Sequence, residues 1–197
     1  MERAATAAEV PAVTACLQSA FFEDPLWGEW AFPDTAVRAE RLARLMRAWA
    51  EPAIPHGWVR ISEHAETVAV WFPPSVQEMS DAQEHAFEQL VQELFGARAA
   101  EMQALLESFE RNHAGHPPHY YLSMWATHRD HAGKRLGTAL LERNLAQIDA
   151  ERMPAYLEST NPANIPRYEA LGFRQRSQFG PQGGPVVTTM WRDARAA

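Results

Sequence analysis

The residues with the clearest chemical potential form a basic loop at positions 128–135, HRDHAGKR. Arg129, Lys134 and Arg135 stand there against Asp130, in a chain whose formal net charge is −7. Where such a loop leads into a helix, free backbone amides and the positive end of the helix dipole lie together and can bind an anion. The loop contains neither a Walker sequence nor the dinucleotide fingerprint. It is therefore a candidate site for a phosphate-like group, with a solvated basic turn as the alternative.

Three histidines, His113, His116 and His119, recur at three-residue spacing and raise the question of a metal site. We expect none, because the prolines and glycine between them predict an extended loop and no cysteine joins the group. The single cysteine, Cys16, falls in a helical pattern, where we expect a small buried hydrophobic residue. It has no partner cysteine in the chain, which agrees with a reducing compartment.

Composition restricts the class of protein. A chain of 197 residues, 46% of them hydrophobic, can bury one core, so we expect a single domain over residues 1–197. No stretch is apolar enough for a membrane span and the first residues lack the apolar part of a secretory signal, so we expect a cytoplasmic protein. The negative charge argues against nucleic acid as a partner and suits a cationic substrate. The oligomeric state is left open, with a homodimer as one option.

The N-terminal half predicts helices and one hairpin, from apolar residues at helical spacing followed by short β-branched and aromatic runs. A capping-box spacing at the first helix and Asp34 before the second mark where these helices begin. The expected elements are a helix from the box at 6–9 to about residue 21, an aromatic-rich connection at 21–34, a helix after Asp34, a hairpin of strands at 57–62 and 66–72, and two helices within 80–112.

The C-terminal half alternates strands and helices, which predicts some parallel strand pairing covered by helices. The expected elements are a strand at 119–128, a helix at 136–152, a strand at 154–160, a short helix at 165–172 and a last strand at 185–192. Their order is read as β-α-β-α-β-β. The predicted fold class is therefore α/β, with a mixed β-sheet flanked by helices.

Several of these segments together resemble the GNAT superfamily of acyl-CoA-dependent N-acetyltransferases, with the puromycin N-acetyltransferases as the nearest pattern. DHAGKRLGTALL resembles the acetyl-CoA motif of that family, and PAYLESTNPANIPRYEALGF resembles its strand, asparagine turn and tyrosine helix. TVAVWFPPSV and AAEVPAVTACLQSAFFEDP resemble its hairpin and first helix. The resemblance is weakest between residues 75 and 118. It implies a GNAT-like mixed sheet that splays open between the strands at 119–128 and 154–160.

The resemblance further implies that acetyl-CoA, as co-substrate, inserts at this splay. Its pantetheine arm would pair with the backbone of Trp125, Ala126 and Thr127, and its pyrophosphate would rest on amides at the start of the next helix. Asn164 matches the family asparagine that contacts the cofactor arm. The residues that the resemblance assigns to the pyrophosphate are Ala132, Gly133, Lys134, Arg135, Leu136, Gly137 and Thr138.

Two positions depart from the family motif, which usually reads Gln/Arg-x-x-Gly-x-Gly/Ala. Ala132 stands at its first position and Arg135 at its first glycine. A positive φ at Arg135 would cost about 1 kcal/mol, whereas a helical φ would cost nothing and leave the guanidinium free to pair with phosphate. We expect the helical conformation, because one turn into a helix most residues have ordinary φ. The two departures put the affinity for the cofactor in question.

Transfer of an acetyl group from a thioester to an amine needs a neutral amine and an acid for the departing thiolate. The resemblance makes Tyr168 that acid, with a half-buried core aromatic as the alternative. Glu158, near the splayed end of its strand, could bind the ammonium or accept its proton, unless it forms a structural salt bridge. Asp24 and Glu29 are rivals for this task. The aromatic candidates for the walls of an acceptor pocket, each of which alone is more often a core residue, are Trp27, Trp30, Tyr120 and Tyr121.

Two hypotheses follow from the sequence. The first is an enzyme that moves an acetyl group from acetyl-CoA to a primary amine of a small molecule by direct attack in a ternary complex, an antibiotic or aminonucleoside-like amine being one option. The second is a non-catalytic GNAT-fold binding or regulatory module, in which Ala132 and Arg135 impair acetyl-CoA binding. The matching places of Asn164 and Tyr168 favour the enzyme.

Overall fold

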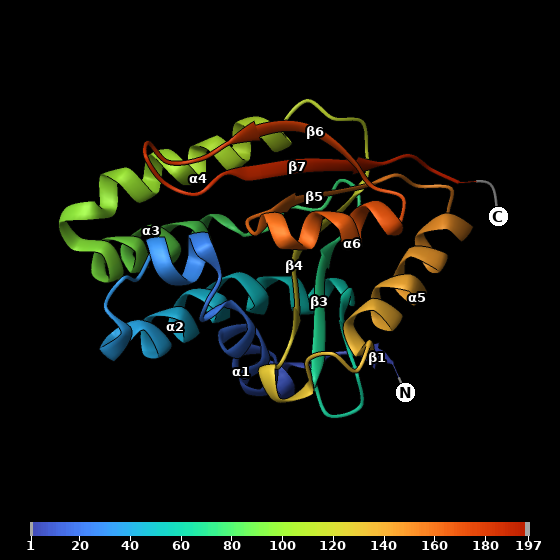
Figure 1. Cartoon of the computed structure of the whole chain (residues 1–197), viewed down its shortest axis with the longest axis horizontal. Coiled ribbons are helices and arrows are strands. Elements are labelled where there is room, and N and C mark those ends of the chain that lie inside the picture. The colour runs from blue at the N-terminus through green and yellow to red at the C-terminus, as the bar shows by residue number, and fades with distance from the viewer. Residues whose placement is uncertain (1, 196–197) are drawn as a thin grey trace.

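A seven-stranded mixed sheet, in the order β1-β2-β3-β4-β5-β7-β6, crosses the computed structural model, which describes residues 2–195 (Figure 1). Only β4 and β5 run parallel, and every other neighbouring pair is antiparallel. The predicted class, a mixed α/β sheet, is confirmed. The strands are β1 (Arg3–Ala4), β2 (Val59–Ile61), β3 (Thr67–Phe72), β4 (Tyr120–Thr127), β5 (Ala155–Ser159), β6 (Arg174–Phe179) and β7 (Val187–Arg192).

The parallel pair separates half-way along its length. Strand β4 pairs with β5 only from Tyr120 to Leu122, against residues 155–157. The rest of β4 pairs with β3 alone, after a register shift that leaves Ser123 without an opposite residue. Glu158, at the end of β5, pairs only with β7. The sheet therefore opens between β4 and β5, as the resemblance implied.

Helices cover the sheet on both faces, and their starts follow the predicted caps. Thr6 and Glu9 form a capping box, and Oδ1 of Asp34 accepts a 3.0 Å hydrogen bond from the amide of Ala36. The first helix is preceded by a single 3-10 turn, Ala7–Glu9. The helices are α1 (Val10–Phe21), α2 (Thr35–Ala53), α3 (Asp81–Phe95), α4 (Ala99–His113), α5 (Leu136–Ala150) and α6 (Ile165–Ala170).

Two hydrophobic clusters separate the two faces of the sheet. Along β3, Val68 and Val70 pack with α1 to α4 in one cluster, while Ala69 and Trp71 pack with α5 and α6 in the other. This alternation follows the two-residue period of a strand whose faces are both covered. The open end of the β4–β5 pair therefore lies between two helical layers, which fixes what can reach it.

Three details differ from the sequence prediction. The segment 21–34, expected to be a connection, contains a short wide helix, Pro25–Trp30, because Oδ1 of Asp24 accepts hydrogen bonds from the amides of Leu26 and Trp27 and caps it. A two-residue strand, β1, pairs with β2 and was not expected. Of the two strands expected at the end of the chain only β7 was located from the sequence, since the exposed polar residues of β6 give little pattern.

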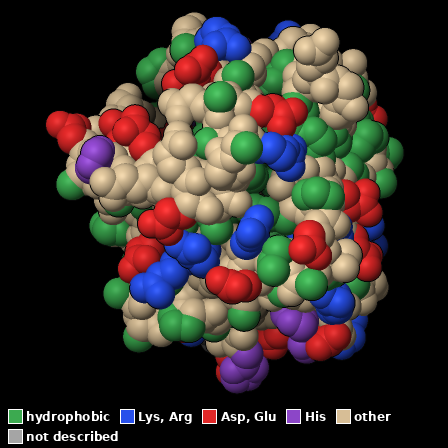
Figure 2. Space-filling model, turned by 90° about the vertical axis from the view of Figure 1, so that its left-hand side faces the viewer, with side chains coloured by type: hydrophobic (Ala, Val, Ile, Leu, Met, Phe, Trp, Pro, Cys, Tyr) green, Lys and Arg blue, Asp and Glu red, His purple; other side chains and the backbone are tan. Residues whose placement is uncertain are grey.

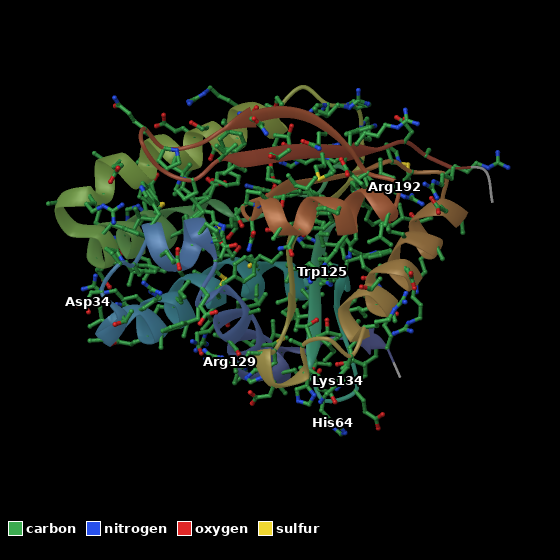
Figure 3. All side chains as sticks on the ribbon, viewed as in Figure 1. Asp34, His64, Trp125, Arg129, Lys134 and Arg192 are labelled. Atoms are coloured by element: carbon green, nitrogen blue, oxygen red, sulfur yellow. The ribbon has the colours of Figure 1, made fainter. Side chains whose placement is uncertain are left out.

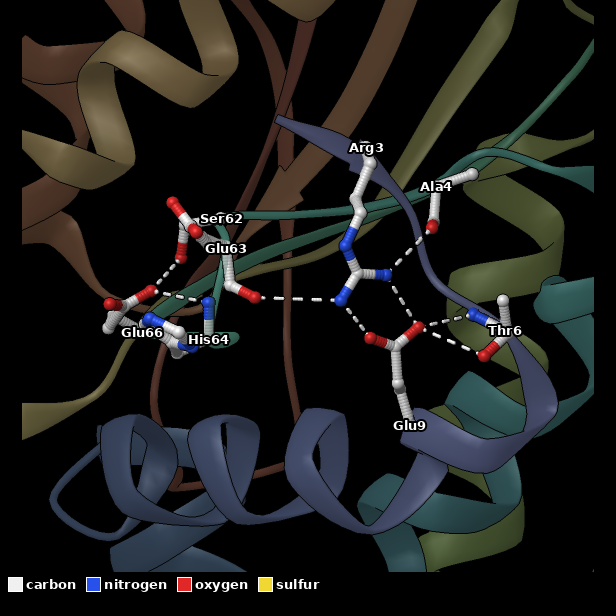
Figure 4. A network of polar contacts seen from close by, with 8 residues as sticks. All are labelled: Arg3, Ala4, Thr6, Glu9, Ser62, Glu63, His64 and Glu66. Carbon is white, nitrogen blue, oxygen red and sulfur yellow. Dashed lines mark hydrogen bonds and ion pairs between the residues drawn. The ribbon is translucent and has the colours of Figure 1, made fainter. Parts of the chain in front are cut away.

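The N-terminal strand is joined to the β2–β3 hairpin by polar contacts (Figure 4). Arg3 pairs with the carboxylate of Glu9 and also donates to the carbonyl of Glu63 in the hairpin turn. In the same turn Glu66 accepts hydrogen bonds from Ser62 and from the amide of His64.

Cys16 is buried, as predicted. Within residues 2–195 no helix has the length and apolar character needed to cross a bilayer.

Candidate active site

Two cavities meet where β4 and β5 separate. The larger, of about 830 Å³, lies between α1 to α4 and the sheet, and we call it the acidic cavity. The smaller, of about 570 Å³, extends from the end of α1 along β4 to the loop before α5, and we call it the basic cavity. Residues from α1, the turn after α1, β4 and the segment after β5 line both cavities. They are Phe21, Asp24, Trp125 and Asn164.

The basic cavity contains almost every residue that the resemblance assigned to the cofactor. Its positive side chains are Arg129, Arg135 and Arg167, against Glu23 and Asp24. Figure 3 shows Arg129 and Lys134 near the loop that precedes α5, and Trp125 further inside the molecule. The assigned residues that line it are Trp125, Ala126, Thr127, Ala132, Gly133, Arg135, Leu136, Gly137, Thr138 and Asn164. Lys134 does not line it; this exposed residue donates from Nζ to the carbonyl of Asp130 over 3.3 Å.

The start of α5 offers backbone donors to this cavity. The first hydrogen bond of the helix runs from the amide of Ala139 to the carbonyl of Arg135, so the preceding amides of Leu136, Gly137 and Thr138 have no partner of this kind. These donors and the helix dipole suit a phosphate group. The N-cap residue of α5 makes no side-chain hydrogen bond to these amides.

Gly137 and Trp125 fit the close approach of a ligand at this point. A β-carbon on Gly137 would lie 2.5 Å from Oγ1 of Thr127, so only glycine lets α5 begin this close to β4. The indole Nε1 of Trp125 is buried and has no hydrogen-bond partner. An unsatisfied buried donor on the wall of a cavity is a position for a polar ligand atom. The residues present therefore fit acetyl-CoA.

Arg135 corrects the expectation made from the sequence. Its φ is 59°, in the left-handed region, because it is the residue that precedes α5 and not a residue inside the helix. Gly133, two residues earlier, also has a positive φ, of 78°. Arg135 therefore carries the strain of about 1 kcal/mol that the family glycine avoids. Its guanidinium nevertheless belongs to the lining of the basic cavity.

The acidic cavity combines carboxylates with aromatic rings. Its lining includes no Lys or Arg. Tyr168, at 7% exposure, reaches it from α6 with its ring centroid 5.5 Å from that of Trp125. Burial raises the pKa of the Tyr168 hydroxyl above its ordinary value, which keeps it protonated at neutral pH. The carboxylates of the lining are Asp24, Glu78, Glu84, Glu88, Glu107, Glu110 and Glu158.

Glu158 is the carboxylate nearest in sequence to the point where β5 leaves β4. Its Oε1 is buried and has no hydrogen-bond partner, and it forms no ion pair among residues 2–195, so the structural salt bridge considered from the sequence is absent. Burial raises the pKa of Glu158 to about 8, an effect that the hydroxyls of Tyr156 and Tyr121 oppose. A carboxyl group with such a pKa can exchange a proton near neutral pH.

The two rivals of Glu158 differ from it. Both carboxylate oxygens of Asp24 are engaged: Oδ1 caps the helix at Pro25–Trp30 and Oδ2 accepts a 2.8 Å hydrogen bond from Oγ1 of Thr160. Burial raises the pKa of Asp24, and its hydrogen bonds act against this rise. Asp24 is thus a structural residue at the junction of the cavities. Glu29 is exposed and lines neither cavity.

The four aromatic candidates divide into two pairs. Trp27 and Tyr121 line the acidic cavity. Trp30 does not, because it lies beneath the guanidinium of Arg98, 4.7 Å from its ring centroid. Tyr120 faces the opposite side of the sheet, where its hydroxyl donates to Glu151 over 2.7 Å. Adjacent residues of a strand point to opposite faces, so Tyr120 and Tyr121 could not both line one pocket.

The three histidines pack near the closed part of the β4–β5 pair. Nε2 of His113 lies 2.9 Å from Nε2 of His119, and the ring of His113 stacks on Tyr156 at 5.2 Å. Burial lowers the pKa of His113 to about 4, so this ring is neutral at pH 7. Among residues 2–195 no group of three or more His, Cys, Asp or Glu side chains is placed to hold a metal ion.

Several residues of the site escaped the sequence analysis. Tyr156 lines neither cavity, but its hydroxyl acts on the pKa of Glu158. It precedes Glu158 by two residues on the same strand face, a relation that the strand period could have revealed. Arg129 was counted only as a loop charge, and Arg167 was not singled out. The carboxylates of α3 and α4 gave no signal, because they look like ordinary charges on the solvent side of amphipathic helices.

Comparison with known proteins places this geometry in context. Residues 62–173 match the family model described as the acetyltransferase (GNAT) family. A structure described as histone acetyltransferase HPA2 and related acetyltransferase, from Corynebacterium glutamicum, is 24% identical, with a TM-score of 0.63 over 100% of this chain and 97% of that one.

Two insect enzymes show the same fold at lower identity. The polyamine N-acetyltransferase of Drosophila melanogaster, which forms N-acetylagmatine, is 16% identical with a TM-score of 0.61, covering 98% of this chain and 99% of that one. Arylalkylamine N-acetyltransferase 2 of Aedes aegypti is 11% identical with a TM-score of 0.67, covering 99% of each chain. These structures are similar in fold along almost the whole chain.

Proposed function

Because the chain belongs to the GNAT family of acetyltransferases, we propose that it transfers an acetyl group from acetyl-CoA to a primary amine of a small molecule in a ternary complex. The observation that carries this proposal is the meeting of two cavities of opposite charge beside Tyr168, where β4 leaves β5. The basic cavity suits the phosphates of the donor, and the acidic cavity suits a protonated amine.

The basic cavity is the proposed site of acetyl-CoA. Backbone groups of β4 at Trp125, Ala126 and Thr127, which have no strand partner on the β5 side, can bind an extended amide-containing arm as an added strand would be bound. The amides at the start of α5 and the guanidinium of Arg135 can hold phosphate oxygens. Bound acetyl-CoA supplies the thioester whose carbonyl carbon the amine attacks.

Glu158 and Tyr168 are the proposed catalytic residues. The ammonium group of the substrate loses a proton to the carboxylate of Glu158, either directly or through a water molecule, and becomes a nucleophile. Its nitrogen forms the new bond to the acetyl carbon while the bond from that carbon to sulfur breaks. The hydroxyl of Tyr168 gives its proton to the departing thiolate, and the second proton that the nitrogen loses on becoming an amide restores this hydroxyl through water. Burial of the Tyr168 side chain and of Oε1 of Glu158 shields both proton transfers from bulk water.

The identity of the amine is not fixed by the family. Solved structures of similar fold are described as enzymes of polyamines, agmatine and arylalkylamines, and the sequence pattern resembles the puromycin N-acetyltransferases. The proposal therefore covers small primary amines, an aminonucleoside-like antibiotic included. It also includes a cytoplasmic location, the compartment expected from the sequence.

A thiol-release assay tests the proposal. Purified protein, acetyl-CoA and a panel of polyamines, arylalkylamines, aminonucleosides, aminoglycosides and peptide N-termini should release CoA with at least one amine, and mass spectrometry should find the acetylated product. Acetyl-CoA at a hundred times its dissociation constant should stabilise the fold by about 2.7 kcal/mol. Absence of both thermal stabilisation and thiol release would instead support a non-catalytic module, the second hypothesis from the sequence.

A further inference from the structure

The acidic cavity holds more negative charge than one ammonium group requires. Seven carboxylates line it without a single Lys or Arg. They occupy two regions: Asp24 and Glu158 belong to the elements at the junction with the basic cavity, and the others to α3, α4 and the segment before α3. On the face that Figure 2 shows, by contrast, acidic and basic side chains lie interspersed. The concentration of one charge is thus a property of the cavity.

The inner region lacks a cation. Asp24 already accepts three hydrogen bonds, but Oε1 of Glu158 is buried with no partner. The neighbouring hydroxyls of Tyr121 and Tyr156 lower the pKa of Glu158, but neither brings a positive charge. A buried carboxylate oxygen without a partner costs free energy unless a ligand or water satisfies it. One ammonium group of a substrate would satisfy Glu158.

In the outer region Glu107 pairs with Arg111 over 3.6 Å, whereas neither Glu78 nor Glu110 forms an ion pair with Lys or Arg among residues 2–195. Glu78, before α3, is raised in pKa to about 7 by burial and by the charge of Glu110 on α4, so these two carboxylates lie within electrostatic reach of each other. The imidazole of His113 lies 3.5 Å from Glu78, but its low pKa leaves it neutral at pH 7. A second cationic group between Glu78 and Glu110 would relieve their repulsion.

Aromatic side chains line the same cavity as the two groups of carboxylates. Trp27 contacts Trp49 edge-on, with ring centroids 4.7 Å apart, and stacks with Phe109 at 5.5 Å. Phe87 continues this wall from α3, 5.7 Å from Trp49. Such a wall accommodates methylene groups and can also face a cation.

The charge of Glu78 also raises the pKa of Glu158, so the two groups of carboxylates lie within electrostatic reach of each other. The cavity therefore combines an apolar wall with two nearby groups of carboxylates, which matches an alkyl chain that carries two amines.

From this arrangement we infer that the acceptor substrate is an alkyl amine with a second positive group, a linear diamine, polyamine or guanidino-alkylamine, whose far cation binds Glu78 and Glu110 while the reacting nitrogen meets Glu158. The inference rests on the proposed acetyl transfer and names its substrate class. A rigid aromatic monoamine would fill the apolar wall but leave the outer carboxylates without a cation.

Matched substrates test this inference. With acetyl-CoA saturating, kcat/KM for 1,5-diaminopentane should exceed that for 1-aminopentane by about 10- to 100-fold, the range expected from a hydrogen-bonded charge pair. In Glu110→Gln, and more strongly in Glu78→Gln, this ratio should fall towards one. The matched control Glu101→Gln, on α4 but outside the cavity and paired with Arg98, should leave the ratio unchanged.

Other outcomes separate failure of the inference from failure of the proposed function. If 1-aminopentane or tryptamine reacts as fast as the diamine, or if Glu110→Gln lowers both pentyl amines equally, the enzyme is an acetyltransferase but not one for dications. If acetyl-CoA neither binds nor releases thiol with any amine, the proposed function fails and the inference fails with it. A KM for the diamine that rises more steeply with salt than that of the monoamine would support the second charge.

Discussion

Thr160 donates a 2.8 Å hydrogen bond from Oγ1 to Oδ2 of Asp24, joining residues 136 positions apart in the chain. Asp24 caps the short helix at Pro25–Trp30, and Thr160 directly follows β5. Both line the acidic cavity. The bond therefore connects the first helical layer to the C-terminal half of the sheet at the place where the two cavities meet.

Thr160→Val should loosen this connection. The valine keeps the shape of threonine but removes the only hydrogen bond to Oδ2 of the buried Asp24 carboxylate that the described residues provide, at a cost of about 1.5–3 kcal/mol in the free energy of unfolding. Acetyl transfer should fall with it, because both cavities depend on the position of Asp24. Chemical denaturation and steady-state kinetics measure the two effects. Thr160→Ser, which retains the hydroxyl, is the control, and equal losses in both variants would contradict this role.

Arg135→Gly should stabilise the protein and weaken its hold on acetyl-CoA. Glycine removes the strain of a φ of 59°, worth up to about 1 kcal/mol, but it also removes a positive charge from the basic cavity. Arg152 provides a matched control, since it has a φ of 56° and lines neither cavity. Arg152→Gly should raise the melting temperature similarly and leave acetyl-CoA affinity unchanged. Equal affinity in the two variants would show that Arg135 does not contact the cofactor.

Glu158→Gln should change both the pH profile and the stability. The rate of the natural protein should rise as the pH passes about 8, where Glu158 loses its proton and can accept one, and this step should vanish in the variant with about 10²-fold lower kcat/KM. Between the ordinary pKa of 4.5 and about 8 the folded protein retains a proton that the unfolded chain releases. Its stability therefore falls with rising pH in this window. Glutamine does not titrate, so the free energy of unfolding of Glu158→Gln, measured relative to that of the unmutated protein, should increase from pH 5 to pH 8. A difference between the two proteins that stays constant over this range would place Glu158 in contact with solvent.

Tyr168→Phe should slow turnover without removing the cofactor site. Loss of the general acid for the thiolate costs about 10²-fold in kcat when acetyl-CoA is saturating, whereas the ring still packs against Trp125. Tyr120→Phe is the control, because its hydroxyl bonds to Glu151 on the other side of the sheet. Unchanged kcat in Tyr168→Phe would remove this tyrosine from the reaction.

Local patterns in the sequence determined most of the elements. The capping box at Thr6 and Glu9, the cap at Asp34 and the alternation of the C-terminal strands and helices reflect interactions over a few residues, and the structure confirms them. The motif around Gly137 and Tyr168 was recognised through its resemblance to the GNAT family. The error at Arg135 was local too: a shift of one residue in the start of α5 changes its φ from helical to left-handed.

Only the tertiary structure decided which charges share a space. Asp24 seemed as eligible as Glu158 in the sequence, and the 136-residue separation of its partner Thr160 hides why its carboxylate is occupied. The glutamates of α3 and α4 look like solvated surface charges until the packing of these helices over the sheet turns them into the wall of one cavity. A sequence records the chemical type and helical face of each side chain. Whether a carboxylate is buried, paired or aimed at another depends on contacts between distant segments, which form only when the chain has folded.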